Sequence, residues 1–246
     1  LLPAQTIRLI ASDMDGTLTQ LGKFTPALLQ ALADLAHADI PVIIVTGRSA
    51  GWVSGIVSYL PVVGAISENG GLFYSTDDPE PQLLVSIADI PTHRQKLAHM
   101  FSELQAEIPQ IRESADNRFR ITDWTFDVQG LSVTQLEQLS DRCSQQGWSF
   151  TYSTVQCHIR PLEQDKAPAL KWVLQHHFSD LNPTQILTIG DSPNDESLFD
   201  PNRFPLSVGV ANIRHYLDRL QHHPAYMTQA EESAGFCELT QRLLSR

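Results

Sequence analysis

Two aspartates, Asp13 and Asp15, stand one residue apart directly after an apolar run at residues 7–12. Two negative charges at this spacing repel each other, so the end of a buried strand is a costly place for both. A divalent cation removes this cost, and Mg²⁺ prefers the hard oxygen ligands that carboxylates supply. Asp191 follows a second apolar run at residues 185–189 and offers a third carboxylate. These residues together predict a Mg²⁺ site.

Phosphoryl transfer is the chemistry that such a site can perform. A carboxylate can attack phosphorus and form an aspartyl phosphate, which divides one difficult step into two easier ones. A second carboxyl group can protonate the leaving oxygen and then activate the water that breaks the intermediate. The Thr46 hydroxyl, backbone amides near Gly16 and a lysine can hold the phosphoryl oxygens. Lys166 is the expected lysine because it begins the predicted helix before the 185–189 strand, whereas Lys171 is expected on the surface.

The segments around these residues alternate short apolar runs with helical patterns. Two further runs, at residues 41–45 and 62–66, are apolar throughout. Strands that are apolar on both faces and alternate with helices indicate a parallel sheet covered on both sides. Such sheets bind ligands beyond the carboxyl ends of their strands. Because Asp13, Thr46 and Asp191 each follow a predicted strand, we expect them to meet at one edge of the sheet.

The middle of the chain changes character after a polar, proline-rich stretch at residues 76–82. A strand pair is predicted around residues 119–128, and a hairpin is predicted from residues 148–152 and 155–160. Adjacent strands of this kind are typical of an α+β module rather than of the alternating flanks. The predicted fold class is therefore α/β with an inserted α+β cap domain. The expected division is a discontinuous core of residues 1–77 and 161–246 and a cap of residues 78–160.

The motifs, taken in chain order, resemble those of the haloacid dehalogenase-like (HAD) superfamily. Residues 13–17 (DMDGT) match its DxDGT signature, residues 46–48 (TGR) resemble its second motif, and Lys166 resembles its third. Residues 190–195 (GDSPND) resemble the GDSxND type of its fourth motif. The resemblance covers essentially the whole chain. The chain looks most like the Cof-type and sucrose-phosphatase-like branch with a type-2 cap, because only the gap between the second and third motifs can hold a cap.

This resemblance implies a Rossmann-like core with Mg²⁺ as the cofactor. It implies that Asp13 is the nucleophile and that Asp15 is the general acid and base. The remaining implied roles are phosphate binding by Thr46, Gly47, Lys166 and Asn194, and metal binding by Asp13, the Asp15 backbone carbonyl and Asp191, with Asp195 supporting the metal-bound waters.

The predicted cap should choose the substrate, and its polar residues are the candidates for that task. Arg118 and Arg120 share one strand parity, as do Asp123 and Asp127, so one face could present cations and carboxylates together. Many such residues simply face solvent, but a mixture of this kind suits a phosphorylated sugar or polyol. The Glu68-Asn69-Gly70 stretch is expected mainly to form a hairpin turn. The candidate specificity residues are Arg48, Asn69, Arg118, Arg120, Asp123, Asp127 and His158.

The composition and net charge of the chain exclude several kinds of protein. The 246 residues are 42% hydrophobic and 18% charged, which is typical of an ordinary globular protein, and the formal net charge is -11. An acidic surface repels phosphate backbones, so we expect no nucleic-acid partner. The three cysteines lack CxxC spacing, and we see neither a transmembrane run nor a signal peptide. We expect a cytoplasmic monomer or small homo-oligomer with no membrane partner.

The sequence favours a Mg²⁺-dependent phosphatase of small phosphorylated metabolites, with sugar phosphates first. Two alternatives stay open. One is a phosphomutase of the phosphomannomutase type, which shares this core and cap. The other is a metabolite-binding regulator without catalysis, although a binding module needs no acid at the position of Asp15.

Overall fold

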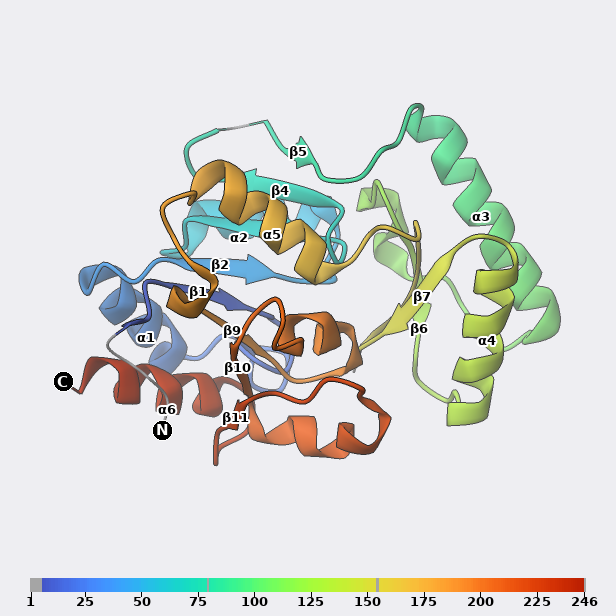
Figure 1. Ribbon diagram of the computed structural model, residues 1–246. Coiled ribbons are helices and arrows are strands. Elements are labelled where there is room, and N and C mark those ends of the chain that lie inside the picture. Colours follow the sequence, from blue (N-terminus) through green and yellow to red (C-terminus); the bar gives the residue numbers. More distant parts are fainter. Residues whose placement is uncertain (1–5, 79, 154, 246) are drawn as a thin grey trace.

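The computed structural model describes residues 6–78, 80–153 and 155–245, and a sheet of eight strands forms the core of this part (Figure 1). Its order is β11-β10-β9-β1-β2-β3-β4-β5. The strands from β11 to β3 are parallel, and β4 and β5 are antiparallel additions at the edge. This arrangement confirms the predicted α/β class with a Rossmann-like core. The strands are β1 (Leu9–Ser12), β2 (Val42–Val45), β3 (Gly64–Ser67), β4 (Leu72–Ser75), β5 (Gln82–Leu83), β9 (Ile186–Gly190), β10 (Leu206–Gly209) and β11 (Tyr226–Met227).

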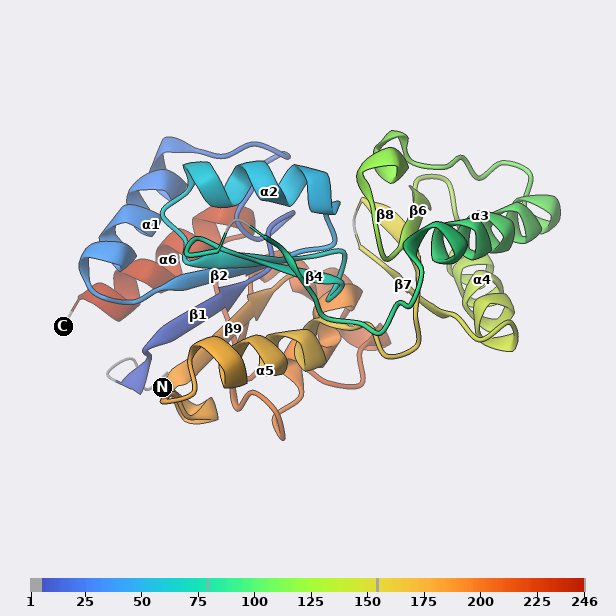
Figure 2. The same cartoon turned by 90° about the horizontal axis from the view of Figure 1, so that it is seen from above.

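Helices cover both faces of this sheet, as its uniformly apolar strands require. Figure 2 shows α1, α2 and α6 on one face and α5 on the other. Alternate residues of one strand serve the two faces: Ile10 packs with α1, α2 and α6, whereas Leu9 packs with α5. The Thr25 side chain caps α1 by accepting the N–H of Leu28 at 3.1 Å. The helices are α1 (Pro26–His37), α2 (Ala50–Tyr59), α5 (Lys166–His177) and α6 (Glu232–Leu244).

A separate three-stranded antiparallel sheet lies beside the core, and we call this sheet and its two helices the cap (Figure 1). Its helices pack on one face and enclose an apolar core of their own around Phe126 and Leu104. The predicted boundaries at residues 78 and 160 stay predictions, but β5 pairs with β4, so the chain leaves the large sheet only after Leu83. The cap elements are α3 (Ile90–Glu107), β6 (Trp124–Asp127), α4 (Val133–Gln145), β7 (Ser149–Tyr152) and β8 (Gln156–Arg160).

The expected strand pair around residues 119–128 is wrong. Only β6 is a strand, and a 3₁₀ helix, η2 (Ala115–Phe119), precedes it. The buried Asn117 side chain explains the difference, because it pairs with the backbone of Thr125 as a neighbouring strand would, at 2.8 and 2.9 Å. Arg118 and Arg120 therefore do not share a face: the first is exposed and the second is buried.

Short 3₁₀ helices connect the later strands of the core. Among the described residues, no helix is both long and apolar enough to cross a membrane. The cysteines Cys143, Cys157 and Cys237 are free thiols. The 3₁₀ helices of this part are η3 (Pro183–Gln185), η4 (Pro193–Phe199), η5 (Ala211–His215) and η6 (Leu217–Arg219).

Candidate active site

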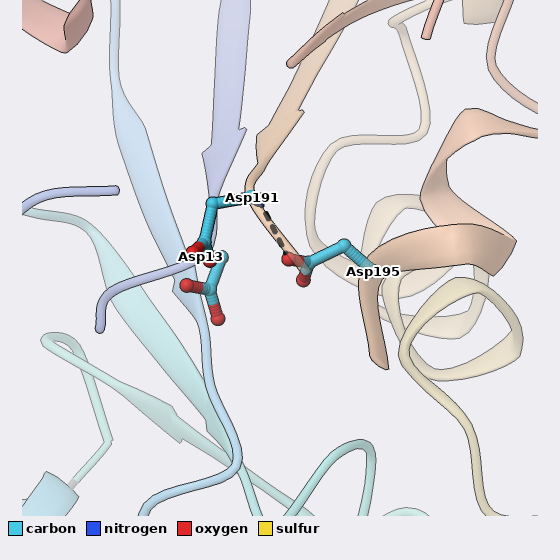
Figure 3. Close-up of side chains that lie close together, drawn as sticks. All are labelled: Asp13, Asp191 and Asp195. Atoms are coloured by element: carbon cyan, nitrogen blue, oxygen red, sulfur yellow. Dashed lines mark hydrogen bonds between the residues drawn. The ribbon is translucent and has the colours of Figure 1, made fainter. Parts of the chain in front are cut away.

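Three carboxylates meet at the carboxyl ends of the two central strands. β1 lies next to β9, so Asp13 and Asp191 leave the sheet side by side, and the Asp13 N–H bonds to the Ile189 carbonyl at 2.8 Å. Asp195 reaches the same space from the start of η4 (Figure 3). One oxygen of each carboxylate lies within 4.8 Å of the others. The structure thus brings together three of the four motif aspartates, Asp13, Asp191 and Asp195, with Asp195 nearer the centre than expected.

Lys166 is buried among these carboxylates. It is the first residue of α5, and its Nζ lies 2.6 Å from Asp13 Oδ1 and 2.6 Å from Asp195 Oδ1. Burial alone would lower the pKa of Lys166, but Asp13 and Asp195 raise it above its ordinary value. The lysine therefore carries a full positive charge at the site. Lys171, on the same helix, is exposed as expected.

One lysine does not balance three buried carboxylates. Burial, with the neighbouring Asp195 charge, raises the pKa of Asp13 to about 7. Burial and the Asp13 charge raise the pKa of Asp191 well above its ordinary value. Asp191 Oδ2 accepts from Asn212 Nδ2 at 2.8 Å, while the buried Oδ1 has no partner. An unpartnered oxygen in a cluster of carboxylates fits a hard cation such as Mg²⁺.

Two motif glycines make room for these carboxylates. A Cβ at Gly16, where φ is +84°, would lie 2.4 Å from Asp191 Oδ2. A Cβ at Gly190 would lie 2.4 Å from the carboxyl carbon of Asp195. Asp195 in turn accepts the N–H groups of Asp191 and Ser192 at 2.9 and 3.2 Å. The glycine in each motif is therefore a steric requirement of the acidic cluster.

Mg²⁺ should stabilise the folded protein, and more strongly at about pH 8 than at about pH 5. Ordinary carboxyl pKa values lie near 4, whereas Asp13 in the folded metal-free protein titrates at about 7. The folded state therefore binds more protons than the unfolded chain across that window, so its stability falls as the pH rises. Mg²⁺ takes the place of those protons. Thermal melts with Mg²⁺ and with EDTA test this, and an equal Mg²⁺ shift at both pH values would contradict it.

The predicted phosphate-binding groups surround the same space. The Thr46 side-chain oxygen accepts the Arg48 N–H at 3.1 Å, which leaves its own O–H able to donate to a ligand. Asn194 accepts from Ser192 Oγ at 2.7 Å and donates to Asn69 Oδ1 at 3.1 Å. Asn69 is buried, and its Nδ2 has no partner. Asn69 thus supports Asn194, and its unpartnered Nδ2 is left to donate to a ligand.

Asp15 stands apart from the acidic cluster and faces Arg48. Arg48 donates from Nε and Nη2 to the two Asp15 oxygens at 2.8 and 2.6 Å. These hydrogen bonds raise the pKa of Arg48 above its ordinary value. The pairing holds the expected acid and base at the wall of the cavity that Asp13 also lines.

The cap closes this site with the β7–β8 hairpin. The cavity between the two parts has a volume of only about 10 Å³, so the cap and core side chains nearly fill it. The sequence analysis identified His158 but missed Ser153, Val155 and Gln156, which lie in the same hairpin. The predicted turn between the two strands was the one sequence feature that pointed to them. The lining residues are Asp13, Asp15, Thr46, Gly47, Arg48, Ser192 and Asn194 from the core and Ser153, Val155, Gln156 and His158 from the cap.

Two buried charged residues, Arg120 and Asp123, orient the His158 ring. Its Nδ1 lies 2.8 Å from Asp123 Oδ2, and Arg120 Nη1 lies 2.9 and 3.0 Å from the two Asp123 oxygens. Burial alone would raise the pKa of Asp123, but Arg120 and His158 lower it. Burial lowers the pKa of His158. The Asp123 carboxylate accepts from Nδ1–H, and the Nε2 edge of the ring lies against Gly47. Asp123 and Arg120 thus act through His158 and do not line the cavity.

Of the seven predicted specificity residues, Arg48 and His158 line the cavity. Asn69, Arg120 and Asp123 are buried and bond to residues of its wall, whereas Arg118 and Asp127 are exposed. Arg118 turns outward because η2 replaces a strand, and Asp127 is the last residue of β6. Two residues at the site were missed: Asn212, which follows a strand end as the motif residues do, and Glu68, which was expected only in a turn.

Replacing Arg120 with methionine should destabilise the protein by about 3–5 kcal/mol. The Arg120 and Asp123 side chains are both fully buried, so the change leaves the Asp123 carboxylate without its main counter-charge. Urea unfolding measures the loss. Arg118→Met, on the exposed side of η2, is the matched control. Equal stability of the two variants would show that the buried pair contributes nothing.

The fold and the site together define a HAD-like hydrolase of phosphoric monoesters. The family model for sucrose-6F-phosphate phosphohydrolase matches residues 6–241, and the chain belongs to that family. It is therefore a phosphatase, with the Cof-type architecture and its type-2 cap.

Relatives and solved structures agree with this assignment. The phosphoglycolate phosphatase of Natronomonas pharaonis is 27% identical over 237 residues, which cover 95% of this chain and 96% of the relative. That of Thermoplasma volcanium is 24% identical over 196 residues, which cover 79% of this chain and 81% of the relative. The structure of Thermoplasma acidophilum 0175 superposes with a TM-score of 0.77 at 20% identity and covers 96% of this chain and 98% of its own. The Synechocystis sp. PCC6803 sucrose-phosphatase, solved with sucrose and phosphate, gives a TM-score of 0.68 at 18% identity, with 96% and 97% covered. At these identities the two structures show a shared fold.

Proposed function

We propose that the protein is a Mg²⁺-dependent phosphatase that cleaves small phosphate monoesters through an aspartyl phosphate on Asp13. One observation carries the proposal. Asp13 lines a small closed cavity while its Oδ1 lies 2.6 Å from the buried Lys166 ammonium. A carboxylate held this way is oriented for attack, and the adjacent positive charge is placed where charge develops on the phosphoryl group.

In the proposed reaction, Asp13 acts as the nucleophile and Asp15 transfers the protons. An Asp13 oxygen forms a bond to phosphorus as the bond between phosphorus and the leaving oxygen breaks, and Asp15 gives that oxygen a proton. Asp15 then takes a proton from the water that attacks the aspartyl phosphate, which releases inorganic phosphate and restores Asp13. Lys166 and Thr46 hold the phosphoryl oxygens. Asp13, the Asp15 carbonyl and Asp191 would hold Mg²⁺, which supplies charge neutralisation to the acidic cluster and the phosphate.

One residue of the cavity and the names of the relatives favour a short, acidic leaving group. Arg48 lines the cavity, and its planar guanidinium could bind a carboxylate of the substrate when its Nε and Nη2 turn from Asp15. The curated relatives are named phosphoglycolate phosphatases. We therefore place phosphorylated hydroxy acids and short sugar phosphates ahead of disaccharide phosphates.

A phosphate-release assay tests the proposal. The panel is 2-phosphoglycolate, glycerol 3-phosphate, glucose 6-phosphate and sucrose 6F-phosphate, each with Mg²⁺ and with EDTA. We expect metal-dependent release, fastest from 2-phosphoglycolate. Fastest release from sucrose 6F-phosphate would overturn this ranking. No release from any ester, followed by isomerisation of a hexose phosphate once a sugar bisphosphate is added, would replace the phosphatase with a mutase.

A further inference from the structure

The reacting groups are shut away from solvent. Asp13 is 3% exposed, and Lys166 and Asp191 are fully buried. A phosphate ester therefore reaches Asp13 only when the cap moves away from the core. Two linkers, residues 84–89 and 161–165, join the cap to the core (Figure 2). Linkers set how far the cap can move, but some other contact must define where it stops.

Glu68 makes that contact. It lies in the β3–β4 turn with φ +53° and is fully buried. Its Oε2 accepts the Thr122 N–H at 2.6 Å and the Thr122 hydroxyl at 2.7 Å, and its Oε1 accepts the Ile121 N–H at 3.0 Å. Oε1 also accepts the Ala50 N–H, at the start of α2, at 2.9 Å. One core carboxylate thus joins the first turn of a core helix to the backbone of the cap.

The cap segment that Glu68 holds leads directly to the cavity. Arg120, on one side of it, donates to the Gly47 carbonyl at 2.9 Å. Asp123, on the other side, binds the His158 ring at 2.8 Å. Arg120 and Asp123 can keep these positions only if the backbone of residues 121–123 is held in place. The position of His158 over the phosphate site therefore depends on Glu68.

We propose that Glu68 is a positioning residue that sets the closed state of the cap, and thereby the placement of His158 over the substrate. The proposal rests on the proposed phosphatase function. A carboxylate suits the task because it only accepts hydrogen bonds, and each of the groups described above as bonded to the Glu68 side chain is a donor. A glutamine at this position would place its side-chain NH₂ group against the backbone N–H groups of the cap segment.

Gly71 supplies an independent test of the same contact. A Cβ at Gly71 would lie 2.0 Å from Thr122 Oγ1, so no other residue lets Thr122 approach the turn this closely. Gly71→Ala should push Thr122 away from Glu68 without touching the carboxylate itself. The two variants should share one phenotype although they alter different residues.

The experiment combines hydrogen exchange with kinetics on the full-length protein. In Glu68→Gln, the amides of residues 121–123 should exchange faster, while those of β1 keep their protection. With 2-phosphoglycolate, kcat/KM should fall by roughly tenfold, mostly through KM, because a smaller fraction of the protein is closed. Glu163→Gln, an exposed isosteric change in the second linker, should match the wild type in both measurements.

Each outcome decides the proposal. Unchanged exchange at residues 121–123 in Glu68→Gln and Gly71→Ala, with unchanged kcat/KM, would overturn it. Faster exchange throughout the chain would assign Glu68 a purely structural role. If Glu68→Gln does not fold, Gly71→Ala alone gives the answer. Absence of turnover in the wild type would remove the phosphatase function, while the exchange data would still decide whether Glu68 holds the cap.

Discussion

Replacing Asp13 with asparagine should lower kcat by at least about 10⁴-fold. The amide cannot attack phosphorus, and no other carboxylate replaces it: Asp191 and Asp195 are bound by Asn212, Lys166 and backbone N–H groups. Stability should behave differently. The variant keeps an oxygen toward Lys166 and removes one of the crowded charges, so the metal-free protein should melt no lower than the wild type.

Phosphate release and thermal melts in EDTA measure the two effects of Asp13→Asn. Asp141→Asn, an exposed change in the cap, should leave both unchanged. Residual turnover above about 1% of the wild type, equivalent to a loss of less than about 3 kcal/mol in transition-state stabilisation, would show that Asp13 is not the nucleophile. A folding defect with lost activity would show instead that Asp13 acts structurally.

Replacing Lys166 with methionine should lower kcat by about 10³-fold, the scale seen when one charge-stabilising donor is removed. It should also destabilise the metal-free protein, since Asp13 and Asp195 each lose a partner at 2.6 Å. Mg²⁺ should restore most of the stability but not the turnover, because the cation neutralises the carboxylates without replacing the ammonium at the phosphoryl oxygens.

Melting temperature and kcat, each titrated against Mg²⁺, separate these effects. Lys171→Met changes the same residue type on the exposed side of α5 and should be neutral in both. Recovery of full activity by Lys166→Met at high Mg²⁺ would show that the lysine serves only to balance charge.

The core could be predicted from sequence because its signals are local and repeated. Strands apolar on both faces specify burial on both sides, and the residues that follow such strands must gather at one edge of a parallel sheet. Asp13, Thr46 and Asp191 came together for that reason. Asp195 lies closer to the acidic cluster than predicted because it folds back onto the N–H groups of its own loop.

The cap was harder because its decisive contacts are between distant side chains and backbone. Asn117 imitates a strand partner for Thr125, which no periodic pattern reveals. The prediction that Arg118 and Arg120 lie on one face of a strand was wrong for the same reason. The sequence predicted only a turn at Glu68, because its partners in the cap, Ile121 and Thr122, lie 53 and 54 positions further along the chain in a segment with no motif of its own.

The strand order also determines which parts of the chain can fold first during its synthesis on the ribosome. Leu9 of the central strand β1 pairs with Ile186, so more than half the chain must be synthesised before β1 gains that partner. The cap elements, by contrast, are contiguous in sequence and can fold as soon as residue 160 leaves the exit tunnel. A chain arrested with residue 160 just outside the tunnel should hold a folded cap and a core whose apolar β1 edge is open, which is a target for chaperones. Asp13 is made before the whole cap, and its neutralising Lys166 emerges only after the cap is complete.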